Sequence, residues 1–285
     1  MIAPHTALLT AAAMLAFAAN SVLCRLALGQ ELIDAASFTS VRVLSGAVTL
    51  GALVLARRGT LARPAADWRS VLALLVYMAF FSFAYLSLSV GTGALILFGA
   101  VQLTMFIVGL RGGEPFPLLS WIGLALAAGG LVYLVAPGVT APDPFGAVLM
   151  AVAGIAWGFY SLFGRSAAHP LEATAGNFVY CVPLVLLVSL WFLGDFHIST
   201  PGLALAIASG AVASGIGYAV WYAALPGLTA TRAATVQLSV PAIAAFAGVA
   251  LLSEEITLRL LIASAATLGG IAVVLAQRAA KTPRV

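Results

Sequence analysis

Long apolar segments follow one another along almost the whole chain, and short connections that hold most of the charged residues separate them. A membrane-spanning helix needs roughly 20 predominantly apolar residues, so a chain of 285 residues has room for about ten such helices and little else. The joints at 90–93 and 226–229 are long enough only for turns, which predicts two tight helical hairpins. The ten candidate spans are residues 5–28, 35–56, 70–90, 93–110, 118–136, 145–163, 172–193, 203–224, 230–250 and 257–277.

The composition excludes a soluble protein. Hydrophobic residues make up 63% of the chain and charged residues 8%, with a mean hydropathy of +1.12, whereas soluble domains carry roughly 25% charged residues. The apolar runs are continuous and do not alternate with polar residues, which excludes a transmembrane barrel. The first run is longer than the apolar core of a signal peptide and follows no basic segment, so we expect it to be retained as a span. The sequence therefore predicts an all-α integral membrane protein with ten transmembrane helices in the lipid bilayer.

Lysine and arginine residues are distributed unevenly between the two ends of the predicted spans. If the N-terminus is cytoplasmic, ten of the 13 lie at cytoplasmic ends, Arg25 and Arg259 lie at outer ends, and Arg42 lies inside the second span. Short loops rich in Lys and Arg stay preferentially in the cytoplasm, so we expect both termini to be cytoplasmic. The net charge of +4 thus reflects membrane topology and not nucleic-acid binding. The ten residues are Arg57, Arg58, Arg63, Arg69, Arg111, Arg165, Arg232, Arg278, Lys281 and Arg284.

The two halves of the chain align when the sequence is shifted by about 140 residues. A shift of 140 places Glu114 on Glu254 and the glycine pair 129–130 on 269–270, and a shift of 135 places 102–104 on 237–239. Each half holds five spans, an odd number, so the second half must be inverted relative to the first. The sequence predicts inverted five-helix repeats at residues 1–140 and 141–285, with a substrate site near the membrane midplane. The shift of 140 also places Phe17, Asn20, Ser21 and Arg25 on Trp157, Tyr160, Ser161 and Arg165.

Several of these features together resemble the EamA branch of the drug/metabolite transporter superfamily over the whole chain. They are the ten short spans, the Gly-Gly pairs in spans five and ten, and the acidic segments 114–116 and 254–257 before the last span of each half. The stretch Tyr218-Ala219-Val220-Trp221 and the aromatic interior are similar to YddG-type aromatic amino acid exporters of bacterial inner membranes. The branch usually carries a proline in both helices four and nine, but only Pro241 is present here, with Met105-Phe106 in the fourth. The resemblance therefore does not imply that both halves bend alike.

The acidic residues give little support for ion coupling. Ionisable groups at the membrane midplane usually mark ion or proton paths, but all nine Asp and Glu residues, and all three His, fall in loops or at span ends. Small multidrug exporters of the same superfamily use a glutamate embedded in the first helix, and this chain has none there. We expect facilitated or weakly coupled transport, with Glu114 or Glu172 as alternative points of proton entry.

Arg42, inside the second span, has two interpretations. Its long side chain could extend to the outer interface, toward Asp34 on the same helix face. Alternatively, it faces the interior and holds a substrate carboxylate. The sequence leaves both open and favours the first.

Aromatic and polar residues at mid-span depth are the candidate substrate-binding residues. Rings can stack on a flat or apolar side chain while amides and hydroxyls bind the polar groups of an amino acid. Packing is the competing explanation for each ring and hydroxyl; for the glutamines it is less favoured, because a primary amide in hydrocarbon needs hydrogen-bond partners. The candidates are Asn20, Ser21, Tyr85, Gln102, Trp157, Tyr160, Tyr218, Trp221, Gln237 and Ser239.

The sequence carries no catalytic or metal-binding motif that would indicate an enzyme. It has no P-loop, HExxH, GxSxG or CxxC pattern, so we expect no cofactor and no direct use of ATP. Cys24 and Cys181 lie in apolar segments and are predicted to be small buried residues. We predict an exporter of small organic metabolites, with aromatic or other apolar amino acids as the substrates. The alternatives are an exporter of drugs or sugar-like metabolites with the same fold and a passive channel, and the oligomeric state is left open.

Overall fold

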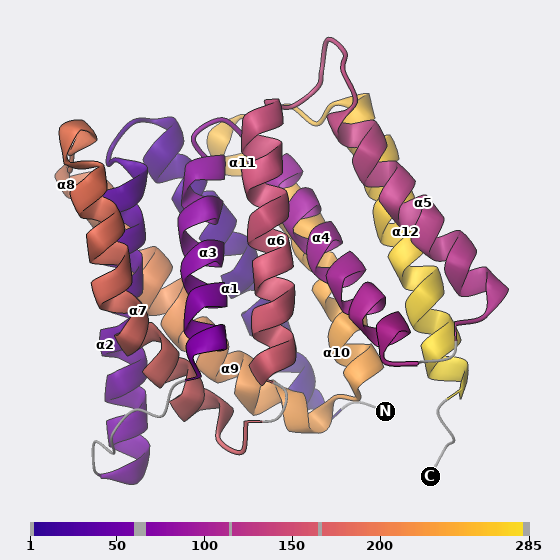
Figure 1. Ribbon diagram of the computed structural model, residues 1–285, viewed down its shortest axis with the longest axis horizontal. Helices are drawn as coiled ribbons and strands as arrows, with labels where there is room; N and C mark the ends of the chain where they lie inside the picture. The colour runs from indigo at the N-terminus through magenta and orange to yellow at the C-terminus, as the bar shows by residue number, and fades with distance from the viewer. Residues whose placement is uncertain (1–2, 60–66, 114–115, 165–166, 282–285) are drawn as a thin grey trace.

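The computed structural model describes residues 3–59, 67–113, 116–164 and 167–281. Within these ranges the chain is helical, and the only strand-like pairing is an isolated bridge between Ile33 and Ile198. The helices run back and forth between two ends of the molecule (Figure 1). The end that carries both chain termini is called the terminal end. The opposite end, which carries the connections 85–89 and 253–257, is called the distal end.

Twelve α-helices and three short segments of other helical types make up this described part. The α-helices are α1 (Pro4–Gly29), α2 (Ala35–Arg58), α3 (Trp68–Ala84), α4 (Val90–Arg111), α5 (Leu118–Val135), α6 (Pro144–Gly164), α7 (Pro170–Trp191), α8 (Thr200–Ile207), α9 (Gly217–Ala224), α10 (Ala230–Gln237), α11 (Ser239–Leu252) and α12 (Leu258–Lys281). The others are the 3-10 turns η1 (Leu193–Asp195) and η3 (Leu225–Gly227) and the π-helical segment η2 (Ala208–Ile216).

Nine helical segments in the described ranges are long and apolar enough to cross a membrane, with 200–227 and 232–252 each counted as one. The prediction of ten long spans differs at the third, because α3 has only 17 residues and ends at Ala84, not at residue 90. The residues that follow form the turn, and the Ser89 side chain accepts a hydrogen bond from the Thr92 backbone N–H to begin α4. A helix cap of this kind leaves no trace in the apolar pattern.

The eighth and ninth predicted spans are each interrupted. The eighth consists of α8, η2 and α9, and its middle part is π-helical. The ninth is divided at Leu238 into α10 and α11. Pro241 has no backbone N–H, so it cannot donate to the carbonyl of Gln237 one turn earlier, and the helix is weakened at this point.

Large apolar side chains cover the outside of the helix bundle. Leu118, Trp191 and Phe246 expose 77%, 86% and 73% of their surface. Large exposed apolar side chains of this kind are unfavourable in water and match a lipid environment. In lipid the surrounding chains are as apolar as the helices, so helices associate through close packing, favoured by small residues.

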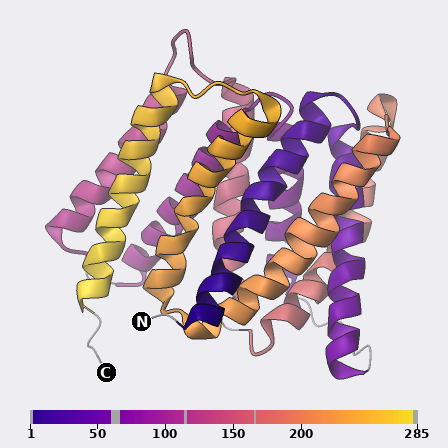
Figure 2. The ribbon, with the colours of Figure 1, turned by 180° about the vertical axis from the view of Figure 1, so that it is seen from behind.

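The crossing of α5 and α12 illustrates this close packing. The two helices lie side by side at one edge of the bundle (Figures 1 and 2). A Cβ atom at Gly123 would lie 2.6 Å from the Gly270 carbonyl oxygen, and a Cβ at Gly270 would lie 2.6 Å from the Ala127 nitrogen. The neighbouring Gly129 and Gly269 have no atom within 4 Å of an added Cβ. A Cβ at Gly130, by contrast, would lie 2.8 Å from the Thr267 nitrogen of α12, so only one member of each Gly-Gly pair lies at a close contact between the helices.

We expect Gly270→Ala to reduce stability by about 1–3 kcal/mol, because the new methyl group meets the backbone of α5. The matched control Gly269→Ala should leave stability unchanged or raise it slightly, since alanine is the better helix former by about 1 kcal/mol. Thermal unfolding of the detergent-purified variants measures both effects. Equal behaviour of the two variants would contradict this description of the crossing.

Candidate functional site

A small cavity lies in the middle of the bundle, between helices from both halves of the chain. It encloses about 30 Å³, which is room for roughly two water molecules. An amino acid therefore fits only if the surrounding helices move apart. The wall consists of Phe17, Asn20 and Ser21 of α1, Tyr77 and Phe81 of α3, Leu97 and Phe98 of α4, Trp157 of α6, Ala213 and Ser214 of η2, Tyr218 of α9 and Gln237 of α10.

Stacked aromatic rings form one side of this wall. Trp157 lies parallel to Tyr218 at 5.4 Å between ring centroids and to Tyr160 at 5.2 Å, with interplanar angles of 19° and 23°. Tyr77 approaches Trp157 to 4.6 Å. Phe17 contacts Tyr218 at 5.9 Å between ring centroids, with the two rings tilted by 55°. The rings come from four helices, so the stack depends on the tertiary fold and not on one helix face.

Polar side chains from α1 and η2 meet in the cavity wall and directly behind it. The Ser209 hydroxyl donates to Asn20 Oδ1 at 2.7 Å, and both side chains are buried. Ser214, five residues later in η2, accepts a hydrogen bond from Arg42 Nε at 3.4 Å. Gln237 reaches the wall from the last turn of α10, where its Nε2 donates to the Ala233 carbonyl at 3.3 Å.

Arg42 is buried completely, with no exposed surface. Its Nη2 donates to the Tyr77 hydroxyl at 3.0 Å, and its guanidinium carbon lies 4.8 Å from the Phe81 ring centroid. The interpretation in which this side chain extends to the outer interface is therefore wrong. Asp34, the partner considered for it, instead caps α2 by accepting a hydrogen bond from the Ser37 backbone N–H.

The structure brings half of the predicted site residues to the cavity wall. Asn20, Ser21, Trp157, Tyr218 and Gln237 are in the wall, whereas the other five lie elsewhere.

Two of these five lie directly behind the wall. Tyr160 stacks on Trp157 and shares a buried hydrogen-bond network with Thr174 and Asn177. Trp221 packs on Phe17, with 6.1 Å between the ring centroids.

The remaining three predicted residues lie away from the wall. Tyr85 is at the C-terminal end of α3, where its hydroxyl donates to the Val90 carbonyl at 3.4 Å. Gln102 is buried in α4 outside the wall. Ser239 is exposed and donates to the Val236 carbonyl.

Sequence reasoning missed the polar residues of η2 and α7. Ser209 and Ser214 belong to a run of small residues that read as helix packing, and Thr174 and Asn177 stand near the start of an otherwise apolar span. Thr174 and Asn177 are three residues apart, as expected on one face of an α-helix, whereas Ser209 and Ser214 are five apart, and the sequence does not show which face turns inward. The described residues contain no group of three or more His, Cys, Asp or Glu side chains that could hold a metal ion.

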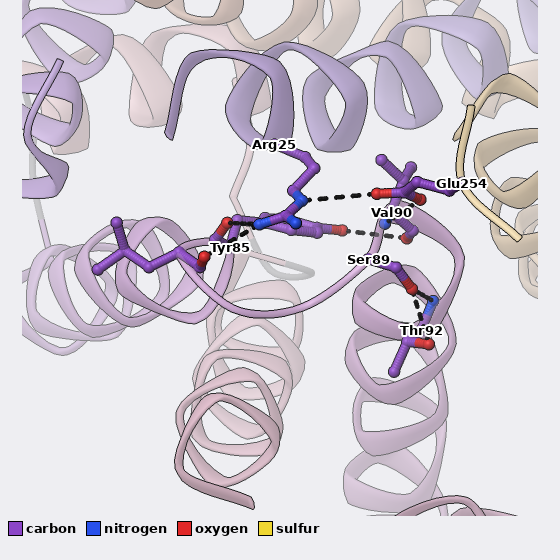
Figure 3. Close-up of polar contacts among 7 residues, drawn as sticks. Arg25, Tyr85, Ser89, Val90, Thr92 and Glu254 are labelled. Carbon is purple, nitrogen blue, oxygen red and sulfur yellow. Dashed lines mark hydrogen bonds and ion pairs between the residues drawn. The ribbon is translucent and has the colours of Figure 1, made fainter. Parts of the chain in front are cut away.

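An ion pair ties three segments together at the distal end. Arg25 Nε lies 3.5 Å from Glu254 Oε1, and Arg25 Nη1 donates to the carbonyls of Tyr85 and Leu86 at 3.1 Å and 3.0 Å. Glu254 Oε2 accepts a hydrogen bond from the Val90 N–H at 2.8 Å. Figure 3 shows that these contacts connect α1, the α3–α4 turn and the connection between α11 and α12. The sequence-related pair Glu114 and Arg165 lies outside the described residues.

Burial raises the pKa of the Glu254 carboxyl group, while the Val90 N–H and Arg25 partly oppose this shift. Arg25 on α1 is the charged group that faces it, and Tyr85 is the nearby titratable group. Glu254 therefore takes up a proton at a higher pH than an exposed glutamate, and protonation removes the ion pair with Arg25.

Comparison with known proteins gives matches that extend over most of the chain. The chain is 50% identical over 280 residues to the Pseudomonas aeruginosa protein "Uncharacterized protein PA1977", with 98% of each chain covered. It is 27% identical over 266 residues to an "Uncharacterized transporter" of Archaeoglobus fulgidus, covering 88% of this chain and 90% of that one. A sequence profile described as "EamA-like transporter family" matches residues 144–276.

A shorter match and a solved structure add to these similarities. The "Uncharacterized inner membrane transporter YedA" of Escherichia coli K12 is 28% identical over 96 residues, 33% of this chain and 31% of that one. One crystal structure superposes over the whole of both chains with a TM-score of 0.68 at 18% sequence identity. This likeness shows that the fold is shared.

The raised pKa of Glu254 predicts a pH-dependent contribution to stability. A carboxyl group with a higher pKa in the folded than in the unfolded protein binds its proton more tightly when folded, so its contribution to stability increases as the pH falls through the folded-state pKa. Relative to Glu254→Gln, the unmodified protein should therefore gain thermal stability between pH 7.5 and pH 5. The exposed neighbour gives the control, and Glu255→Gln should track the unmodified protein. A difference between Glu254→Gln and the unmodified protein that does not change with pH would contradict the prediction.

Proposed function

The chain belongs to the EamA-like transporter family and is a multi-pass membrane transporter, and we propose that it exports small organic metabolites across the bacterial inner membrane. The proposed substrates are amino acids with aromatic or other apolar side chains. The observation that carries this proposal is the composition of the cavity wall, which combines stacked rings with amide and hydroxyl groups. The similarity of the 218–221 stretch to YddG-type exporters supports the same substrate class.

The wall offers a partner for each part of such a substrate. The face of Trp157 or Tyr218 can stack on an aromatic side chain or lie against an aliphatic one. A ring face also attracts an ammonium group. The side chains of Asn20, Ser21 and Gln237 provide hydrogen-bonding groups for the substrate's polar end.

The pattern of helix contacts supports two inverted five-helix repeats at residues 1–140 and 141–285. In this plan, the helices α1 to α5 of the first repeat correspond in order to α6, α7, α8–α9, α10–α11 and α12 of the second. The packing of α3 on α6 then has its counterpart in the packing of the α8–η2–α9 segment on α1. The packing of α4 on α6 corresponds likewise to that of α11 on α1. The pairs α2–α7, α4–α11 and α5–α12 each join two equivalent helices. In such a plan, access to a central site alternates when one bundle rocks against the other.

We assign the terminal end to the cytoplasm because the basic residues of the short connections gather there. Arg57, Arg58 and Arg111 lie at that end of α2 and α4, and short basic loops favour the cytoplasmic side. The distal end then faces outward and is tied by the Arg25–Glu254 ion pair. An exporter must open this end to release its substrate, so the ion pair is proposed to break in each cycle.

We propose facilitative transport driven mainly by the substrate gradient. The proposal depends on the position of the acidic residues, which in the sequence all fall at span ends or in loops. If transport responds to pH, Glu254 is the first candidate for the protonated residue, because its pKa is raised.

Counterflow into proteoliposomes tests the substrate and the mechanism together. Labelled phenylalanine, threonine and methionine are offered to vesicles loaded with the unlabelled compound, with and without an imposed pH gradient. Saturable exchange that ignores the gradient is the expected result. Uptake that requires the gradient would contradict facilitative transport, and uptake without saturation or exchange would indicate a passive channel. Exchange of drugs or sugar-like compounds in place of any amino acid would contradict the proposed substrate class.

Gln237 and Ser239 provide a matched test of the cavity. Gln237→Ala removes a hydrogen-bonding group from the wall, so we expect substrate affinity to fall by about fivefold to tenfold, the effect of one hydrogen bond. Ser239→Ala removes an exposed hydroxyl two residues away and should leave affinity unchanged. Competition binding on the purified variants measures both. Unchanged affinity in Gln237→Ala would remove this residue from the proposed site.

A further inference from the structure

Arg42 carries a positive charge into the middle of the bundle, where a charge is most unfavourable. It has no exposed surface, and its helix α2 lies against η2 so closely that a side chain on Gly210 would collide with the Arg42 carbonyl. An ionised group in this position is normally stabilised by an opposite charge or by a set of hydrogen bonds that uses all its donors. The neighbours of the guanidinium therefore decide what else it binds.

The protein groups around the Arg42 guanidinium are neutral and leave part of it unused. Nη2 donates to the Tyr77 hydroxyl, and Nε donates to Ser214 Oγ at the long distance of 3.4 Å. The rings of Tyr77 and Phe81 lie over it at 5.4 Å and 4.8 Å. Nη1 is buried and has no hydrogen-bond partner among the described residues.

The described acidic residues lie at helix ends or in loops, and five of these eight residues contact other groups. Glu254 pairs with Arg25 and Glu172 pairs with Arg58. Asp34 and Asp67 accept hydrogen bonds at the beginnings of α2 and α3. Asp143 accepts hydrogen bonds from Ser87 and the Gly146 N–H. No ion pair joins Arg42 to any of the described carboxylates, so its charge is available to an anion from outside the chain.

Arg42 is also placed where a transported molecule would meet it. Tyr77, Phe81 and Ser214, the three residues that contact its guanidinium, are all part of the cavity wall. Because the cavity must widen to admit an amino acid, movement of these wall residues would bring the guanidinium into contact with the ligand.

We propose that Arg42 is the anion-binding residue of the central cavity and that its guanidinium binds the carboxylate of the transported molecule. This inference rests on the proposed function, because it assumes that the substrate enters this cavity. A planar guanidinium presents paired N–H donors that match the two oxygens of a carboxylate. A single arginine balances a single negative charge, which favours a monocarboxylate over a phosphate dianion.

Binding of chemically matched ligands to the purified protein tests this inference. Phenylalanine, phenylalaninamide (which lacks the carboxylate) and 3-phenylpropionate (which lacks the ammonium group) are compared by ligand-induced thermal stabilisation. We expect the unmodified protein to bind phenylalanine and 3-phenylpropionate, and to bind the amide about 10- to 100-fold more weakly, the effect of one charge-assisted hydrogen-bonded pair. In Arg42→Gln, phenylalanine should bind no better than the amide, whose own affinity should not change. Equal weakening of both ligands would indicate a structural role for Arg42 and overturn the inference.

Two further variants separate charge from folding. Arg42→Lys keeps the charge but loses the paired donors, so it should retain a preference for the carboxylate at reduced affinity. This variant and the unmodified protein decide the question if Arg42→Gln does not fold. The control Arg58→Gln removes an arginine that pairs with Glu172 far from the cavity wall, and it should discriminate between the ligands as the unmodified protein does.

The outcomes also distinguish this inference from the proposed function. Exchange of amino acids without discrimination against the amide would overturn the role of Arg42 and leave the proposed function standing. Binding of 3-phenylpropionate that depends on Arg42, with no binding of any amino acid, would keep the anion site and contradict the proposed substrate class. Absence of binding by both amino acids and monocarboxylates would overturn the anion site as well.

Discussion

Close contact between helix backbones is the constraint on which this structure depends. In lipid the hydrophobic effect does not drive one apolar helix onto another, so the helices associate where small residues allow close approach. Gly123 and Gly270 bring α5 and α12 together, and Gly210 brings η2 against the carbonyl of Arg42. The second contact places Ser214 in the cavity wall and Arg42 directly behind it. The packing of small residues thus determines where the polar groups of the interior lie.

The cavity and the distal ion pair are two parts of one closed state. The cavity holds about 30 Å³, too little for an amino acid, and the Arg25–Glu254 pair with its backbone hydrogen bonds holds α1, the α3–α4 turn and the α11–α12 connection together at the distal end. Opening this end separates charges that are only partly shielded from water. A substrate carboxylate that binds Arg42 would enter a cavity that already carries a positive charge.

Much of the helical plan could be predicted from hydropathy, because the apolar runs are long and their connections short. The end of α3 could not, since the Ser89 cap and the turn before it consist of residues that also occur within spans. Five of the ten predicted site residues reach the cavity wall. Gln102 does not, although its helix α4 contributes other residues to the wall, and neither does Tyr85, which directly follows the wall helix α3. Which face of an apolar helix turns inward depends on its neighbours. The sequence favours the interfacial interpretation of Arg42 for the same reason, because it does not reveal Tyr77 and Ser214 as partners of this side chain.

The π-helical form of η2 has a consequence for the geometry of the interior. Hydrogen bonds from residue i to i+5 bring residues five apart nearly above one another, whereas at about 100° per residue in an α-helix they would point in clearly different directions. Ser209 and Ser214 are five apart, and they contact Asn20 of α1 and Arg42 of α2. A change of this segment to α-helix would turn one serine away from its partner. The hydrogen bonds that α1 and α2 make to η2 therefore both depend on the π-helical form of this one segment. A change in its helical form that breaks one of these bonds also affects the geometry of the other.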